Sequence, residues 1–213
     1  VDLDHTKLLG KTVESIAMVK AGVIKRDTPC IIGATQKSVI NIFKKRADDL
    51  NTQCIVLGKE SHIQAKLLGI KGSLLSAKVL DTIFAKLHIS LLGRHQVNNA
   101  VLVLYIVQVL RSRGWLISDQ AIRDGFSQAF IPGRLEIVQD NPMIILDGAH
   151  NPAKTKALAS SLKKLFPARP ITFIFAMKKG KNLEDSLKPL LPLADKIIVT
   201  RFSQKRSRST AYI

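Results

Sequence analysis

The first third of the chain alternates amphipathic helical patterns with short apolar runs. Apolar residues recur at near-helical spacing over Val13–Ala21 and again over Ser38–Leu50, which predicts two helices. The apolar runs Cys30–Ile32 and Cys54–Leu57 predict strands. Ser61–Ser90 shows no dominant period, and we expect only short strands there. The second helix is expected to bury Val39, Ile42, Phe43, Ala47 and Leu50.

The strongest helical pattern covers Gln96–Arg111. It is apolar nearly all round, so we expect this helix to be central. Ser118–Phe130 predicts a shorter helix with Ser118 as its N-cap. Ile131-Pro132-Gly133 then breaks the pattern. We expect a domain boundary there, which divides the chain into residues 1–131 and 132–213.

Beyond Pro132 predicted strands and helices alternate regularly along the chain. Predicted strands at Met143–Leu146, Ile171–Phe175 and Lys196–Thr200 alternate with predicted helices at Pro152–Phe166 and Leu183–Leu191. Such alternation predicts an α/β fold with a parallel sheet and right-handed crossovers. Only a short basic tail follows the last strand, so we expect this second domain to be incomplete.

Charge adds a competing interpretation. Lys and Arg total 33 against 16 Asp and Glu, a formal charge of +17, which raises a basic nucleic-acid-binding module as an alternative. The basic residues are dispersed apart from Lys205–Arg208, and aromatic residues make up 5% of the chain, which is little for base stacking. Both features argue against that module. A generally basic proteome and a surface that attracts anionic substrates remain two further explanations.

Composition also bears on membranes and export. The longest nearly apolar stretch, Ala100–Val109, is shorter than the ~20 residues that span a bilayer. Asp2 and Asp4 interrupt the first residues, so we expect no secretory signal. Cys30 and Cys54 lack the clustering of a zinc site and fit a reducing cytosol. We therefore expect a cytoplasmic protein that does not associate with membranes.

Asp147, His150 and Asn151 stand where a predicted strand ends and a helix begins. In open α/β sheets ligands bind beyond the carboxyl ends of strands. A carboxylate there can accept from a ribose hydroxyl, and a histidine or the backbone amides of the helix start can face a phosphate. The structural alternative is an Asx-turn in which Asn151 caps the helix ahead of Pro152.

Other polar residues lie at comparable positions. Arg134 follows the Pro-Gly break, where an arginine can clamp a phosphate as domains close, although a surface arginine is the alternative. His95 and Asn99, spaced i and i+4, share a face at a helix start, where they can also serve as a capping pair. His5 is a possible metal ligand, and Lys20 would become one only as a carbamate.

Two segments superficially resemble a phosphate-binding loop. Gly10-Lys11-Thr12 would need a glycine at the position of His5, and Gly180-Lys181-Asn182 would need one at Phe175. Neither segment is therefore interpreted as such a loop.

Four segments occur in the order and spacing of the Mur-ligase superfamily, and most closely resemble its folate branch, the folylpolyglutamate synthases and dihydrofolate synthases. The similarity runs from Val1 to about Thr210. The segments are Asp4–Lys25, Leu92–Ala100, Pro132–Glu136 and the Asp-Gly-Ala-His-Asn-Pro stretch Asp147–Pro152.

The resemblance implies a domain assignment and a set of site residues. Residues 1–131 would be the C-terminal part of a central ATP-binding domain, and 132–213 a partial Rossmann-like C-terminal domain, with ATP between them. The implied site comprises His5 and carbamoylated Lys20 as ligands of Mg²⁺, Asn99 beside the adenine, Arg134 on a phosphate, and Asp147 and His150 on the nucleotide and its terminal phosphate. Lys20, Arg134 and His150 would be catalytic.

The implied reaction is amide-bond formation by a monomeric, ATP-dependent ligase. ATP would phosphorylate a carboxylate of folate or dihydropteroate, and the amino group of L-glutamate would attack the acyl phosphate. Dihydropteroate and reduced folate both remain possible acceptors. A peptidoglycan Mur ligase is the alternative within enzymes, and the nucleic-acid-binding module is the alternative of another class.

The sequence departs from the family pattern at three places. Val19 replaces an acidic residue, and Gly180-Lys181-Asn182 replaces an Asp-Lys-Asp. No glycine-rich phosphate loop and no acidic magnesium ligand precede Asp4. We therefore expect a fragment, a split gene product or a decayed one, inactive by itself.

Overall fold

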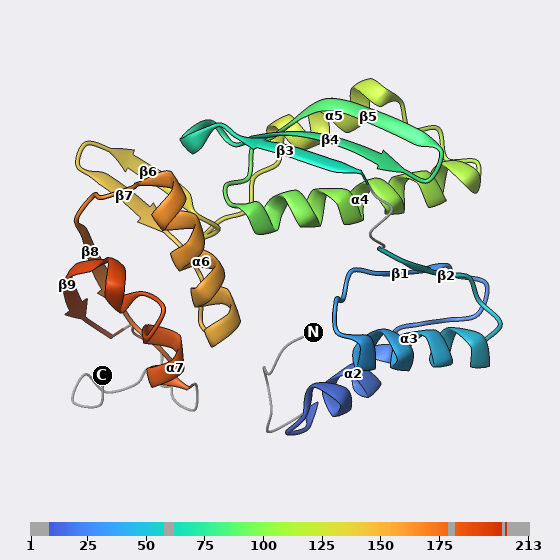
Figure 1. Cartoon of the computed structure of the whole chain (residues 1–213), viewed down its shortest axis with the longest axis horizontal. Coiled ribbons are helices and arrows are strands. Elements are labelled where there is room, and N and C mark those ends of the chain that lie inside the picture. Colours follow the sequence, from blue (N-terminus) through green and yellow to red (C-terminus); the bar gives the residue numbers. More distant parts are fainter. Residues whose placement is uncertain (1–8, 58–61, 179–181, 202, 204–213) are drawn as a thin grey trace. The chain divides into compact units, whose positions relative to one another are not determined.

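The computed structural model describes residues 9–57, 62–178, 182–201 and 203 (Figure 1). The chain forms two compact units. The first unit comprises Val1–Lys66, Leu74–Ile89 and Val97–Gln128, and the second comprises Leu67–Ser73, Ser90–Gln96 and Ala129–Ile213. The predicted division at Pro132 stays a prediction. No helix in the described residues is long and apolar enough to cross a membrane.

The first unit opens with a small layer of two helices and two strands. Helix α2 (Val13–Ala21) begins at a capping box formed by Thr12 and Ser15. Strand β1 (Cys30–Ile32), helix α3 (Lys37–Asp49) and strand β2 (Cys54–Val56) follow, and β1 and β2 pair in parallel. These elements confirm the helices and strands predicted here. Their core contains Ala21, Ile24 and Ala47, with Cys30, Ile42, Phe43, Leu50 and Cys54 packed against it.

A three-stranded sheet in the order β3-β4-β5 follows along the chain (Figure 1). Its strands and the intervening 3-10 helix are β3 (Ile63–Leu67), η1 (Gly69–Lys71), β4 (Ser73–Val79) and β5 (Thr82–Ile89). Burial alternates along β4, so one face of this strand packs in the core. Strands of seven and eight residues are longer than the short strands expected here.

Two helices accompany this sheet. Helix α4 (Arg94–Ser112) buries Val97, Val101 and Leu104, but Val103 and Ile106 on its other face are 42% and 41% exposed. One face of this helix is therefore buried and the opposite face is partly exposed, although its residues are apolar nearly all round. Helix α5 (Asp119–Gln128) contacts β5, and its cap is as predicted, because Ala121 N donates to Ser118 Oγ at 3.0 Å.

The second unit contains two small sheets and the helices that cover them. It contains β6 (Glu136–Asp140), β7 (Met143–Leu146), α6 (Pro152–Leu165), β8 (Ile171–Phe175), α7 (Leu183–Leu187), η2 (Leu191–Leu193) and β9 (Ala194–Val199). β8 and β9 pair in parallel, as the alternating pattern predicts. β7 instead pairs antiparallel with β6, a strand that the pattern missed, so the expectation of a wholly parallel sheet is wrong. α7 ends earlier than predicted, and the Leu-Pro-Leu segment after it forms η2.

The core of the second unit draws on distant parts of the chain. Leu92, Leu135, Leu162 and Phe166 form one buried cluster, and Ala159, Phe175, Met177 and Leu190 form another. Leu92 precedes α4, Leu135 precedes β6, and Leu162 lies on α6. The packing thereby brings the start of α4, the turn before β6 and helix α6 into one body.

Candidate functional site

Asp147, at the end of β7, joins two turns of the second unit. Its Oδ2 accepts from the backbone N–H of Leu135 at 2.9 Å, and its Oδ1 accepts from that of Ala149 at 2.8 Å. The first bond reaches the start of β6 and the second closes an Asx-turn. A carboxylate has about four acceptor positions, so Asp147 can still accept from a ligand hydroxyl.

Arg134 lies in the turn before β6, held against the turn after β7. Gly133 N donates to Glu136 Oε2 at 2.7 Å, and Gly148 N donates to Gly133 O at 2.8 Å. A Cβ on Gly148 would lie 3.3 Å from Nη1 of Arg134, so the guanidinium passes close over this glycine. Within the described residues the Arg134 side chain is half-buried and has no hydrogen bond or ion pair. Its donors remain available to an anion.

His150 and Asn151 immediately precede α6, and Asn151 caps it. Asn151 Oδ1 accepts from Lys154 N at 2.9 Å, and Pro152 takes the first helical turn, so the predicted capping role of Asn151 is present. His150 Nδ1 lies 2.8 Å from Gly148 O, and Lys154 Nζ lies 3.1 Å from His150 Nε2. Both contacts are satisfied when Nδ1 of a neutral His150 donates to the carbonyl and Nε2 accepts from the Lys154 ammonium.

His95 lies at the start of α4, where the charges of Asp147 and Arg134 both affect its pKa. Its pKa is lowered, mainly because burial disfavours the imidazolium; Asp147 raises the pKa, and Arg134 lowers it. Gly93, with φ +97°, makes room for this ring, because a Cβ there would lie 2.8 Å from His95 Cε1 and 2.7 Å from Ser161 Oγ. The structure therefore groups His95 with Arg134 and Asp147.

The other predicted site residues lie elsewhere. Asn99 is exposed on α4, and Lys20 is exposed in the last turn of α2; both belong to the first unit. His5 lies outside the described residues. The structure thus brings together Arg134, Asp147 and His150, whereas the roles of Asn99, Lys20 and His5 stay predictions.

Two residues of this group were not assigned to the site from sequence. Lys154 follows His150 at i+4, a spacing that could have drawn attention to it. The sequence placed His95 at a helix start on the same face as Asn99, but its proximity to Asp147 depends on tertiary packing that no local pattern predicts.

The described residues do not by themselves make a magnesium site. No group of three or more His, Cys, Asp or Glu side chains among them could hold a metal ion. Lys20 carries an ammonium unless modified, and a cation is a poor neighbour for Mg²⁺. No chemical step is therefore assigned to the metal.

A small hollow lies next to this group in the second unit. It is lined in part by Gly69, Gly72, Gly93 and Ser161 and has a volume of about 10 Å³. That is roughly the room one water molecule needs, far less than a nucleotide occupies.

Comparison with known proteins agrees with the architecture. A family model described as "Dihydrofolate synthetase, C-terminal domain" matches residues 134–207. The chain is 32% identical over 212 residues to the dihydrofolate synthase/folylpolyglutamate synthase of Bacillus subtilis, an alignment that covers 96% of this chain and 48% of that protein. It is 33% identical over 184 residues to the folylpolyglutamate synthase of Lacticaseibacillus casei, covering 85% and 42%.

Solved structures match the fold as well. The Mycobacterium tuberculosis folylpolyglutamate synthase complexed with ADP superposes with a TM-score of 0.89 at 28% identity, over 98% of this chain and 47% of that one. An FPGS-AMPPCP-folate complex gives a TM-score of 0.85 at 30% identity, over 93% and 48%. The chain spans about half the length of the relatives it matches. The predicted Mur-ligase-like α/β fold is confirmed, and nearly the whole chain is similar to folylpolyglutamate synthases and dihydrofolate synthases.

Proposed function

We propose that this chain supplies part of the nucleotide site of an ATP-dependent ligase that joins L-glutamate to folate or dihydropteroate through an acyl phosphate. The observation that carries the proposal is the half-buried Arg134, which has no hydrogen bond among the described residues and lies beside the turn that Asp147 holds in place. Relatives of this chain have been solved with ADP and with AMPPCP. We further expect the ligase to act as a cytoplasmic monomer.

Arg134 is the residue best suited to a phosphate. A guanidinium binds phosphate oxygens through two parallel N–H donors and neutralises the charge that builds up during phosphoryl transfer. The guanidinium lies close to Gly148, in the turn that follows Asp147, where a side chain in place of glycine would crowd it.

Three further groups would act with Arg134. Asp147 can accept from a ribose hydroxyl with the acceptor positions that its two backbone donors leave unused. His150 and Lys154 stand at the start of α6, where the helix dipole also favours an anion. Lys154 can move from His150 Nε2 to a terminal phosphate, and His150 Nε2 could then exchange a proton with the ligand.

The remaining roles rest on the family resemblance. Asn99 would contact the adenine, and His5 with a carbamoylated Lys20 would hold Mg²⁺, which supplies charge neutralisation at the phosphates when bound. The exposure of Lys20 leaves its amine accessible to carbon dioxide.

Nucleotide binding by the purified chain tests the proposal without requiring turnover. Arg134→Ala should weaken binding of ATP or ADP by about 10- to 100-fold, the usual effect of losing a charge-assisted hydrogen bond in a partly buried site. The measurement is a titration with a fluorescent ATP analogue, followed by competition with unlabelled ATP.

Arg169→Ala is the matched control. It removes the same charge from an exposed position of the same unit, where Arg169 bonds to other described residues only through its backbone N–H. An equal loss of affinity in both variants would mean that Arg134 acts only through net charge, and would contradict the proposed site.

A further inference from the structure

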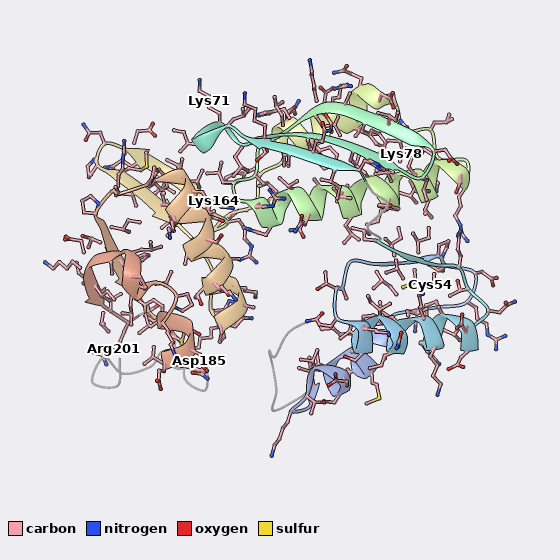
Figure 2. The ribbon with its side chains drawn as sticks, viewed as in Figure 1. Cys54, Lys71, Lys78, Lys164, Asp185 and Arg201 are labelled. Carbon is pink, nitrogen blue, oxygen red and sulfur yellow. The ribbon has the colours of Figure 1, made fainter. Side chains whose placement is uncertain are left out.

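The only two cysteines of the chain lie opposite each other in the first unit. Cys30 opens β1 and Cys54 opens β2, and these strands pair in parallel with Cys30 and Cys54 as direct partners. Helix α3 separates them along the chain and packs on the same two strands. Figure 2 shows Cys54 on β2, beside α3.

Their geometry suits a covalent bond. Paired residues of neighbouring strands are about 4.7–4.9 Å apart, which lies inside the Cα–Cα range of about 4.4–6.8 Å found in disulfides. Both side chains pack against the cluster of Ala21, Ile24 and Ala47, so they lie on one face of the two strands. The thiols also interact directly, since a side-chain hydrogen bond joins Cys30 to Cys54.

The surroundings keep both groups protonated near neutral pH. Burial raises the pKa of the Cys30 thiol, and Cys54 raises it further. Burial also raises the pKa of the Cys54 thiol, although Lys44 and the Cys30 hydrogen bond partly oppose this and Asp48 reinforces it. Cys54 is therefore the better candidate for the first thiolate.

We propose that Cys30 and Cys54 form a reversible intramolecular disulfide in the folded chain, with a small-molecule disulfide as the oxidant. The Cys54 thiolate attacks the S–S bond of the oxidant and releases one small thiolate. The Cys30 thiolate then attacks Cys54 Sγ in the mixed disulfide and releases the second. The two cysteines lose two protons and two electrons, and the oxidant becomes two thiols.

The position of the bond decides what it would do. Both cysteines are the first residues of their strands, so the bond would join the amino ends of β1 and β2. Ligands in α/β sheets approach the carboxyl ends. The disulfide would therefore stabilise the layer formed by β1, α3 and β2 without crossing that edge.

The test is equilibration of the purified chain in buffers of oxidised and reduced glutathione, followed by acid quenching, alkylation and mass spectrometry. The folded chain should lose the mass of two hydrogen atoms, resist alkylation at both cysteines and stay monomeric on a non-reducing gel. The equilibrium constant should be about tenfold or more higher in native buffer than in urea, because the fold holds the thiols together. Oxidation should speed up as the pH rises, because both pKa values are raised.

A shifted pair is the matched control. Cys54→Ser combined with Ile55→Cys moves the second thiol by one residue, to the opposite face of β2. This variant should oxidise in urea but not when folded, with circular dichroism confirming the fold. A native equilibrium constant no higher than that in urea would overturn the proposal. So would glutathione adducts or dimers as the main products, or equal oxidation of a folded shifted pair.

Discussion

At the scale of single residues, the site depends on charges that are close but not paired. His95, Arg134 and Asp147 influence one another, yet both carboxylate oxygens of Asp147 accept from backbone amides and neither is committed to Arg134. The carboxylate fixes the turns, and the guanidinium keeps its donors. This separation of tasks explains how an arginine can stay available beside an acidic residue.

The lowered pKa of His95 makes stability depend on pH. Burial holds its folded-state pKa below the unfolded value of about 6.5, so the unfolded chain binds the proton more readily. The contribution of His95 is therefore fully present above that unfolded value. It is lost as the pH falls from there towards the lower folded-state pKa. Urea denaturation at a series of pH values should show this loss in the wild type.

His95→Gln supplies the comparison. The variant cannot titrate, so its free energy of unfolding should fall less steeply with decreasing pH than that of the wild type over the same range. Identical pH profiles would show that burial of His95 does not disfavour its protonation.

At the scale of elements, helices were predicted better than sheet pairing. The patterns of α2, α3 and α4 place the helices within a few residues, because caps and amphipathic spacing are local properties. The sequence did not predict β6, because its only apolar residues are Ile137 and Val138 between polar neighbours. Its pairing with β7 also depends on tertiary contacts that no local pattern shows. Motifs identified Arg134, Asp147 and His150, but the approach of His95 to them depends on the packing of the second unit.

The turn into α4 provides a test at this scale. Gly93 and Gly114 both have positive φ, at +97° and +88°, so alanine strains the backbone at either position. At Gly93 the new Cβ also meets Ser161 and His95 at less than 3.0 Å, whereas nothing lies within 4 Å at Gly114. Gly93→Ala should cost about 1–3 kcal/mol of unfolding free energy more than Gly114→Ala.

Thermal or urea denaturation of the two variants gives the comparison. Equal losses would mean that α4 and α6 do not approach closely at Gly93. A change in the His95 imidazole resonances confined to Gly93→Ala would add independent support.

At the scale of the whole chain, the charge of +17 is spread over many elements. Figure 2 labels three of the lysines: Lys71 on η1 and Lys164 on α6 belong to the second unit, and Lys78 on β4 belongs to the first. Arg111 pairs with Asp119 at 2.7 Å, but Lys and Arg total 33 against 16 Asp and Glu, so the chain has too few carboxylates to neutralise all of its basic side chains.

This distribution predicts weak and diffuse attraction to nucleic acid. Filter binding with labelled single- and double-stranded DNA should show association at low salt that falls by about 100-fold or more by physiological ionic strength. Preference for one sequence that survives physiological salt would contradict this and favour the nucleic-acid-binding alternative.

The bonds between the two turns have a practical consequence for protein engineering. Two hydrogen bonds join the turn that contains Arg134 to the turn that contains His150, although β6 and β7 lie between these turns in the sequence. Leu135 N donates to Asp147, and Gly148 N donates to Gly133 O. A sequence change that moves one turn must displace the other. Grafting either turn alone from a relative should misplace the guanidinium, whereas residues 133–151 form a cassette that can be exchanged whole.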